Sequence, residues 1–507
     1  MTETRTADQT QTPSPATGST RLVLASIGLL LLLASLDQSI VATALPTIVA
    51  DLGGIDHLSW VVTAYILTST IVAPLYGKLG DLYGRRNTIF VSVALFMTGS
   101  VLCGMATSMT FLIVARAIQG LGGGGLFVLA LSVVGDVVPP RERGKVQGIF
   151  AAVFSTSSVL GPLAGGWLSE NANWHWIFFI NIPLGLIAVL GFAYAFKPRG
   201  IRTRRQIDWW GAITLTLFLG ALTLLTSLGG RSFSYASPEG LTLAALSLIS
   251  LLAFIRIESR AAEPILPLWL FKMNVFWVTS IIGFIVGASL FGALTFVPLY
   301  LQIAKGTTPT ESGLLLIPLT VGILTASTLA GMYMGRTGRY WALPVIGMSL
   351  LFVGMMLMTR LAQDTSTVVF SASLIMVGLG MGCVFPVATT AVQNAVPRET
   401  MGTATAAGIM MRQTGGALGV AAFGALFTHR FMAGLGDSAT ALGDISQIGP
   451  QTLASLPPDL QAQLATSVIS AIAPIYWIAA GLALVGLVFA FMLKEVPLTS
   501  RIVPKGE

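Results

Sequence analysis

The sequence is poor in charged residues, and this shortage excludes an ordinary soluble protein. Asp, Glu, Lys and Arg make up only 10% of the 507 residues, whereas soluble globular domains carry about 25%. Hydrophobic residues make up 54%, so most of the surface cannot face water. The sequence therefore predicts an all-α membrane protein, because helices satisfy their own backbone hydrogen bonds in lipid.

Other scarce features narrow the function. The two cysteines, Cys103 and Cys383, lie inside apolar runs, and with three scattered histidines they suggest neither a disulfide framework nor a metal site. No Gly-rich loop carries the Lys and Ser/Thr of a nucleotide-binding site, which argues against an ATP-driven pump. No catalytic triad or nucleic-acid patch stands out either. We therefore expect a protein that is not an enzyme and needs no cofactor.

Apolar runs long enough to cross a bilayer recur along the whole chain. A span needs about 20 residues, and the first run, of about 25, is too long for the core of a signal peptide. We expect fourteen spans, at 22–46, 58–77, 88–107, 110–135, 145–168, 175–196, 209–228, 239–257, 275–304, 311–335, 341–360, 367–393, 401–428 and 468–492.

The basic residues indicate the orientation of these spans. Most of the 28 Lys and Arg residues fall in the tails and in the loops on one side, above all in "KPRGIRTRR" at 197–205. The loops on the other side hold only Arg231, Lys305, Arg360 and Arg430. The positive-inside rule therefore places both termini in the cytoplasm and the polar segment 431–467 outside.

A weak internal repeat indicates two related halves. "ASLD" at 34–37 matches "ASLF" at 288–291, and Gly77 and Gly161 match Gly331 and Gly415 at the same spacing along the chain. We expect two six-helix bundles with two inserted helices between them. The expected parts are a disordered tail (1–21), a first bundle (22–196), a linker with two extra spans (197–274), a second bundle (275–493) and a cytoplasmic tail (494–507).

Asp37 is the one acidic residue that we place deep within a span. A charge at the centre of a membrane helix costs about 2.5–3.5 kcal/mol on insertion scales, and a buried carboxylate readily takes up a proton. Its neighbours on its own helix face are apolar, so any partner must come from another span. Two interpretations stay open at this point, a structural hydrogen bond and a proton-coupling group.

Two further motifs contain polar groups close to or within spans. "GKLGDLYGRR" at 77–86 lies between spans 2 and 3 on the cytoplasmic side. "ARAIQGLGGGG" at 115–125 puts Arg116 and Gln119 on one helix face, because residues three apart are neighbours on a helix. The glycines that begin with Gly120 allow a neighbouring helix to come close.

These stretches together resemble the major facilitator superfamily. The 77–86 loop matches its signature at Gly77, Asp81, Gly84, Arg85 and Arg86. The span 4 motif resembles a second signature. "LDQSIVATALPTI" in span 1 and "WHWIFFINIPLG" at 174–185 resemble motifs of its 14-span drug/proton antiporters. The resemblance covers all the expected spans and implies the major facilitator fold, with the 77–86 loop as a gate.

"LGPLAGGWL" at 160–168 resembles the signature of the superfamily's exporters. Gly161 and Gly165 form a small-residue face, Pro162 removes a backbone hydrogen bond, and Gly166 widens the smooth surface. Plain helix packing explains part of this pattern. The resemblance implies more, namely a pliable contact between the two bundles that controls opening.

The second half offers a polar pair, Arg412 and Gln413, in span 13. Arg412 could line a central cavity or sit near the cytoplasmic end and reach the lipid headgroups, and the sequence does not decide between them. Phe291 and Tyr300 of span 9 could face a lipophilic substrate, although most such aromatic residues pack against helices.

The resemblance implies a proton-driven multidrug exporter of a bacterial cytoplasmic membrane. Asp37 would couple protons to transport, with Arg116 as its modulator, and the substrates would be lipophilic neutral or cationic compounds. We expect protons, substrate and lipids as partners, no nucleic acid, and a monomer. The alternatives are a lipid or specialised-metabolite exporter on the same fold, and a membrane sensor or scaffold that transports nothing.

Overall fold

The computed structural model describes residues 17–53, 58–197, 208–230, 233–435 and 457–498, and within these ranges the regular elements are helices. In the first half and the insertion they are α1 (Thr17–Leu52), α2 (Leu58–Tyr83), α3 (Arg85–Gly104), α4 (Met109–Val137), α5 (Pro140–Asn171), α6 (Trp176–Phe179), α7 (Asn181–Ala195), α8 (Trp209–Leu228) and α9 (Pro238–Glu258). In the second half they are η2 (Leu268–Lys272), α10 (Asn274–Gly287), η3 (Ala288–Ala293), η4 (Leu294–Phe296), α11 (Val297–Leu299), η5 (Tyr300–Ala304), α12 (Pro309–Leu314), α13 (Ile317–Thr337), α14 (Ala342–Met358), α15 (Thr367–Ala395), η6 (Arg398–Thr400), α16 (Met401–Leu435) and α19 (Pro458–Phe491).

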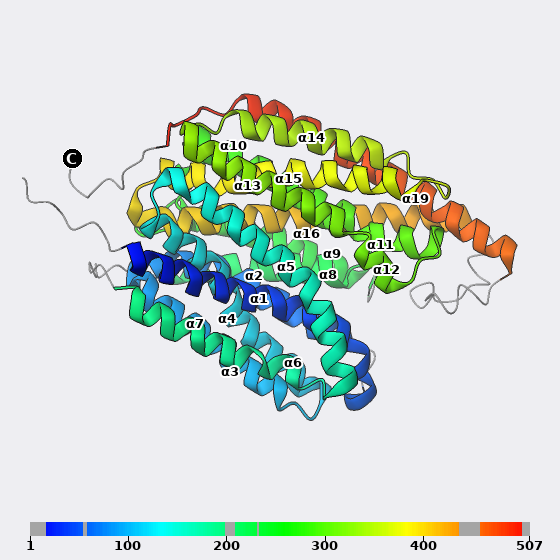
Figure 1. Cartoon of the computed structure of the whole chain (residues 1–507), viewed down its shortest axis with the longest axis horizontal. Helices are drawn as coiled ribbons and strands as arrows, with labels where there is room; N and C mark the ends of the chain where they lie inside the picture. Colours follow the sequence, from blue (N-terminus) through cyan, green and yellow to red (C-terminus); the bar gives the residue numbers. More distant parts are fainter. Residues whose placement is uncertain (1–16, 54–57, 198–207, 231–232, 436–456, 499–507) are drawn as a thin grey trace, which may run out of the picture.

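The helices form two groups that follow the chain order (Figure 1). One group contains α1 to α7, and the other contains α10 to α19. Contacts between the groups run mainly from α5 to α13 and from α2 and α4 to α16. The inserted pair α8 and α9 pack on each other, and α8 also packs against α2 of the first group and α16 of the second. The start of α1 and the segment after α19 lie at the same end of the molecule, on the left in Figure 1.

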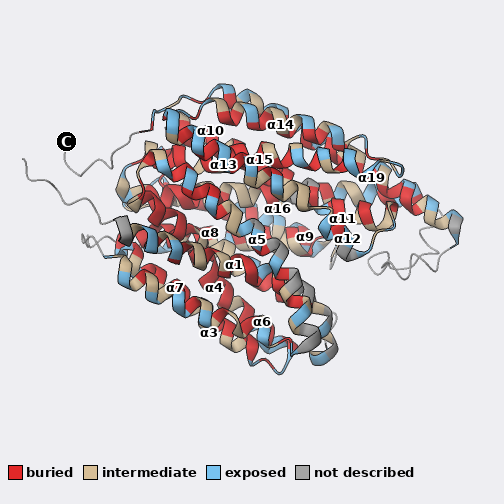
Figure 2. Cartoon of the chain, viewed as in Figure 1, coloured by how far each residue is buried: buried red, intermediate tan, exposed pale blue. Residues whose placement is uncertain are grey.

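The outer faces of many helices are apolar and exposed, as a lipid-facing surface requires. On α7, Leu186, Ile187, Leu190 and Tyr194 are all exposed. Figure 2 shows that buried residues concentrate where the helices face one another, whereas exposed residues lie on outward faces such as those of α7 and α14. A soluble protein rarely exposes such continuous apolar faces, so these faces fit hydrocarbon rather than water.

Twelve helical segments among the described residues are long and apolar enough to cross a membrane. All fourteen spans that the sequence predicts overlap helices in the structure. The two that fall outside the twelve lie in α5, a 32-residue helix, and in the shorter α14, of 17 residues. The all-helical membrane architecture is thus present, and the count of fourteen spans stays a prediction.

Several predicted boundaries were wrong. α1 begins at Thr17, inside the tail that we expected to be disordered up to residue 21. α16 continues to Leu435 and α19 already begins at Pro458, so the expected loop 431–467 is shorter. Residues 436–456 and 1–16 lie outside the described part of the chain. These helices run on because their polar ends extend beyond the apolar window that sequence reading detects.

The expected cytoplasmic tail, 494–507, is held in place over its described part. The backbone N–H of Leu498 donates to the carbonyl of Gly338 at 2.9 Å. Arg141 Nε of α5 donates to the carbonyl of Leu498 at 3.0 Å. The segment therefore touches both groups of helices, and residues 499–507 lie outside the described part.

The ninth predicted span, 275–304, is not one regular helix. α10 ends at Gly287 and is followed by two π-helical stretches, Ala288–Ala293 and Tyr300–Ala304, with short 3₁₀ and α turns between them. Pro298 lies between the π stretches and lacks the backbone N–H that a regular helix needs. Its repeat counterpart α1 runs for 36 residues as one α-helix.

Candidate coupling and transport site

Asp37 of α1 lies at the centre of a closed polar network within the first group of helices. Its side chain is fully buried, and Arg116 of α4 is 1% exposed. Arg116 Nη1 donates to Asp37 Oδ2 at 2.6 Å. Gln119 Nε2 and Asn181 Nδ2 donate to Asp37 Oδ1 at 2.7 Å and 2.9 Å. The carboxylate thus receives three donors, all from other helices, as its apolar surroundings on α1 predicted.

A second layer of contacts holds these donors in position. The same Nη1 of Arg116 donates to Gln119 Oε1 at 2.6 Å, and its Nε donates to the carbonyl of Val61 at 3.2 Å. The guanidinium also lies over the ring of Tyr65, at 4.4 Å from the centroid. Ser100 of α3 accepts from both amides, at 3.2 Å from Gln119 and 2.8 Å from Asn181. Each donor group thus contacts a second partner besides Asp37, so it is held in position and the ionised carboxylate is well stabilised in this conformation.

Sequence analysis missed Asn181 and Ser100. Asn181 begins α7 and stands inside the quoted motif "WHWIFFINIPLG", where it is an isolated polar residue in an apolar run. That isolation was a usable signal. Ser100 gave none, because serine occurs in membrane helices for many reasons and here donates to the carbonyl of Phe178 at 2.9 Å.

The glycines of α4 allow the network to form. A Cβ at Gly120 would lie 2.5 Å from the carbonyl oxygen of Tyr65 on α2, and one at Gly122 would lie 2.2 Å from the backbone nitrogen of Phe96 on α3. Such distances leave no room for a side chain. The glycine run therefore brings α2 and α3 close to α4, as the sequence predicted, and Arg116 is enclosed among helices rather than lipid.

Asp81, near the end of α2, joins the two groups of helices. Its Oδ1 accepts from the backbone N–H of Gly402 at 3.0 Å, and its Oδ2 accepts from the backbone N–H and the hydroxyl of Thr403 at 2.8 Å and 3.0 Å. Both residues belong to the first turn of α16, whose unpaired N–H groups and dipole favour a carboxylate. Arg85 also pairs with Asp81, at 3.2 Å.

The other residues of the predicted gating loop build this contact. Gly84 has a φ of 87°, a left-handed conformation that favours glycine, and it separates α2 from α3. Arg85 bridges Asp81 to Asp136 of α4, at 2.7 Å from the latter. Arg86 donates to the carbonyl of Ala193 at 3.0 Å. A Cβ at Gly77 would lie 2.8 Å from the carbonyl oxygen of Gly402, so α2 and α16 touch backbone to backbone.

Gly161 of the exporter motif does not make the contact between the bundles that the resemblance implied. A Cβ at Gly161 would lie 2.0 Å from the hydroxyl of Ser39 on α1, so this glycine packs within its own group of helices. Gly165 is buried, whereas a Cβ at Gly166 would meet nothing within 4 Å. The side chain of Pro162 lies outside the described residues. The expected contact between bundles is therefore not made at Gly161.

α5 contacts the second group of helices through a different pair of glycines. A Cβ at Gly144 would lie 3.0 Å from Cα of Gly331 on α13. A Cβ at Gly148 would lie 3.2 Å from the carbonyl oxygen of Ser327 on the same helix. The sequence shows that α5 has a small-residue face, but not which neighbour that face meets.

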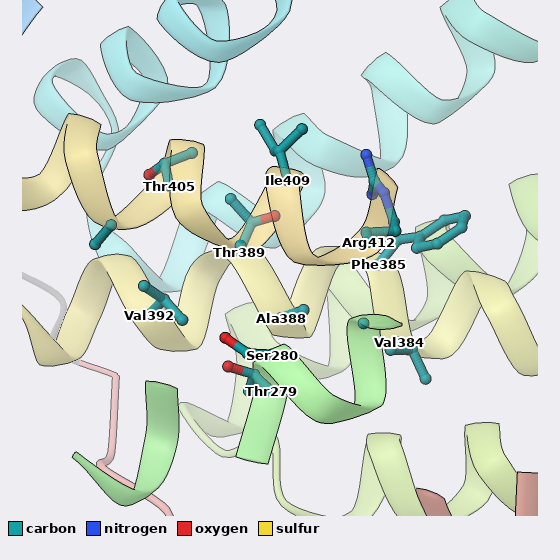
Figure 3. Close-up of a pocket in the computed structure, with 13 residues that line it drawn as sticks. Thr279, Ser280, Val384, Phe385, Ala388, Thr389, Val392, Thr405, Ile409 and Arg412 are labelled. Atoms are coloured by element: carbon teal, nitrogen blue, oxygen red, sulfur yellow. The ribbon is translucent and has the colours of Figure 1, made fainter. Parts of the chain in front are cut away.

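Of the residues predicted to line a cavity in the second half, some do so in the structure and others do not. Arg412 lines a cavity between α10, α15 and α16 (Figure 3). Tyr300 does not, because it is buried in the core of the second half, with its hydroxyl donating to the carbonyl of Ala362 at 2.8 Å. Gln413 Oε1 is buried without a hydrogen-bond partner among the described residues. The side chain of Phe291 lies outside the described residues.

Comparison with known proteins identifies relatives along most of the chain. An uncharacterized MFS-type transporter of Mycobacterium tuberculosis is 40% identical over 471 residues, which are 92% of this chain and 68% of the relative. The multidrug transporter protein MdtP of Bacillus subtilis is 39% identical over 414 residues, covering 81% of this chain and 75% of the relative.

Solved structures share the fold at low sequence identity. The proton:xylose symporter XylE superposes with a TM-score of 0.61 at 15% identity, over 94% of this chain and 96% of that one. The family model of the Major Facilitator Superfamily matches residues 27–420. This chain, a multi-pass membrane protein with a closed polar network in its first half, therefore belongs to the Major Facilitator Superfamily.

Proposed function

We propose that this protein is a proton-coupled multidrug exporter of lipophilic neutral or cationic compounds in a bacterial cytoplasmic membrane. One observation carries the proposal, namely the buried contact of 2.6 Å between Asp37 and Arg116. A charge pair inside a membrane helix bundle is costly, and such residues mark ion pathways and proton relays. The bacterial relative named as a multidrug transporter supports the direction and the class of substrate.

The coupling step follows from the charge balance of the network. Ionised Asp37 and Arg116 compensate each other, so the closed network carries no net charge. When Asp37 takes up a proton, its hydrogen bonds from Arg116, Gln119 and Asn181 weaken, and the guanidinium remains buried without a counter-charge. This favours a rearrangement of α1 against α4 and α7. Proton release then restores the present arrangement.

Alternating access further requires the contact between α2 and α16 to break. Asp81 binds the first turn of α16 through three hydrogen bonds, each worth about 1.5–3 kcal/mol when one group is charged. Gly77, Gly84, Arg85 and Arg86 shape and orient this contact. We infer that it closes the cytoplasmic side while the opposite side is open, and that coupling at Asp37 decides when it opens.

We infer fourteen spans with both termini in the cytoplasm. The basic loops support this orientation, and α5 and α14 complete the count beyond the twelve long apolar helices. A tag at the C-terminus should be reached by a membrane-impermeant reagent in inverted vesicles and not in intact cells. Labelling of intact cells would contradict the count.

Transport by purified protein in sealed vesicles tests the proposed function. We expect an imposed pH gradient to drive the accumulation of lipophilic dyes and antibiotics, and collapse of the gradient to stop it. A panel that includes lipids separates multidrug export from lipid export. Absence of gradient-driven movement of every compound, with correctly inserted protein, would favour a sensor or scaffold instead.

A further inference from the structure

Arg412 holds a positive charge deep in the second half of the protein. It lies eleven residues after Met401, the first residue of α16, which is about 16 Å along the helix axis at 1.5 Å per residue. The side chain is only partly exposed. At this depth the guanidinium cannot reach the headgroup region by extending along the helix. The alternative of a snorkelling side chain, left open by the sequence, therefore does not fit.

No described residue supplies a counter-charge to Arg412. The described ion pairs are those of Lys78, Arg85 and Arg116, all in the first half or reaching it. In the described helices of the second half, acidic residues occur only at helix starts, as Glu311, Glu399 and Asp459. Asp37 is already saturated by its own three donors. The one close partner described for the guanidinium is the ring of Phe385, at 5.1 Å.

An aromatic ring stabilises a guanidinium without neutralising it. The ring contacts a face of the planar group, and the five N–H donors lie around its edge. No hydrogen bond from these donors is found among the described residues. Buried cationic groups normally find an anionic partner. The face of the guanidinium of Arg412 therefore has an aromatic partner, whereas the N–H donors at its edge have no partner among the described residues.

The space beside Arg412 is a small cavity, mainly apolar in its lining with a few polar groups, rather than a packed core. Figure 3 shows residues of α10, α15 and α16 around it, with Arg412 and Ile409 extending to the same side of α16. Its volume is about 30 Å³, which suits a water molecule or one small polar group. A Cβ at Gly283 or at Gly408 would meet nothing within 4 Å, and the buried hydroxyl of Ser280 has no hydrogen-bond partner among the described residues.

We propose that this cavity is an anion subsite, in which Arg412 binds the carboxylate or sulfonate of a lipophilic acid. The inference rests on the proposed transport function and adds lipophilic acids to the neutral and cationic substrates proposed above. A carboxylate matches the fork of N–H donors on a guanidinium. The cavity holds only this group, so the apolar remainder of the molecule extends out of it. Because the Asp37–Arg116 pair is internally neutral, the uncompensated charge at Arg412 favours monoanions over monocations at this subsite.

A charge series on one scaffold tests the proposal. We would measure the binding of pyrenebutyrate, its neutral amide and pyrenebutylamine to the full-length protein in lipid nanodiscs, without any gradient. Wild type should bind the carboxylate at least about tenfold more tightly than the amide, which corresponds to about 1.4 kcal/mol, and the amine least tightly. Partitioning of the probes into lipid cancels in ratios between variants, because all samples share one lipid composition.

Two substitutions of Arg412 and one control locate the effect. Arg412→Gln should weaken carboxylate binding about tenfold and leave amide binding unchanged, and Arg412→Lys should retain part of the preference. Arg360→Gln removes one cation at an exposed position and should match wild type. An equal loss for all three probes in Arg412→Gln would assign Arg412 a structural role and overturn the proposal.

The wild-type ranking, with free probe concentrations corrected by partitioning into empty nanodiscs of the same lipid, decides the matter even if an Arg412 variant does not fold. Equal binding of carboxylate and amide by wild type overturns the proposal. Chloride could bind at the same charge, so the series is repeated over a range of chloride concentrations in wild type and in Arg412→Gln, which shares any effect of ionic strength. An equal response of the two proteins supports a substrate subsite, and a large gain in carboxylate affinity at low chloride in wild type alone would assign the site to inorganic anions instead. This binding test uses no gradient. A negative result here therefore does not contradict proton coupling at Asp37, and a negative result for proton coupling does not contradict the anion subsite.

Discussion

The two halves of the protein treat a deep arginine in opposite ways. In the first half, Arg116 pairs with Asp37 at 2.6 Å inside a network of amides and a serine. In the second half, Arg412 lies over Phe385 beside a cavity, without a carboxylate among the described residues. A buried ion pair such as Asp37–Arg116 can change its arrangement when its carboxylate takes up a proton. A charge that is left uncompensated is available to a ligand.

The helix geometry also differs between the two halves. α1, which carries Asp37, is one α-helix of 36 residues, whereas the corresponding segment after α10 contains two π-helical stretches. π-Helical turns often accompany functional sites and let a helix change register locally. We infer that the second half adapts locally to its substrate.

The largest expected effect comes from breaking the network at its acid. Asp37→Asn keeps the size and polarity of the side chain but cannot ionise, so gradient-driven efflux should be abolished while substrate binding stays measurable. Vesicle transport at matched protein levels, with and without an imposed pH gradient, checks this. Asp364→Asn, in an exposed loop, is the control and should transport normally. If Asp37→Asn still concentrates substrate in response to the gradient, the carboxylate has a structural role only.

The comparison is sharpest when each arginine is replaced by leucine. Arg116→Leu leaves a buried carboxylate without its counter-charge, and breaking a buried pair in this way typically costs about 3–5 kcal/mol. Arg412→Leu leaves no partner behind, so it should be nearly neutral or stabilising. Thermal unfolding in one detergent measures both. Equal destabilisation by the two substitutions would mean that Arg412 has a counter-charge in the folded protein.

A smaller effect is expected where the two halves meet. Asp81→Asn removes the charge from the contact with the first turn of α16, which should cost about 1–3 kcal/mol and slow the transport cycle without unfolding the protein. Glu142→Gln is the control, because it removes an exposed carboxylate from the first turn of α5 in the same half. Turnover of Asp81→Asn at the level of this control would argue against a gate.

Much of the site could be predicted from the sequence, because a polar residue in an apolar run is conspicuous. Asp37, Arg116 and Gln119 were identified in this way, and all three meet in the structure. Their mutual contact could not be predicted, since sequence spacing says nothing of distances between helices. Asn181 stood in the quoted motif and was not singled out, because one amide in an apolar run is a weaker signal than a charge.

The packing partners of small residues were harder to predict. Gly161 was expected between the bundles and packs on Ser39 of its own half, whereas Gly144 and Gly148 make the contact with α13. A stripe of small residues predicts close approach and does not name the neighbour.

The smallest expected effect concerns the inserted helices, which touch both halves. Lys78, near the gate end of α2, pairs at 3.2 Å with Glu263, which follows α9. The two side chains are 11% and 27% exposed, so solvent and salt weaken the pair, and pairs of this kind contribute about 0–1 kcal/mol. Lys78→Gln should therefore slow transport only slightly, and the difference from wild type should shrink as ionic strength rises.

Lys145→Gln, which removes an exposed cation from α5, should show no such difference at either salt concentration. If Lys78→Gln slows transport as strongly as Asp81→Asn, and equally at high salt, then α8 and α9 take part in the gate itself, and the contrast between two halves would have to include the insertion as a third moving part.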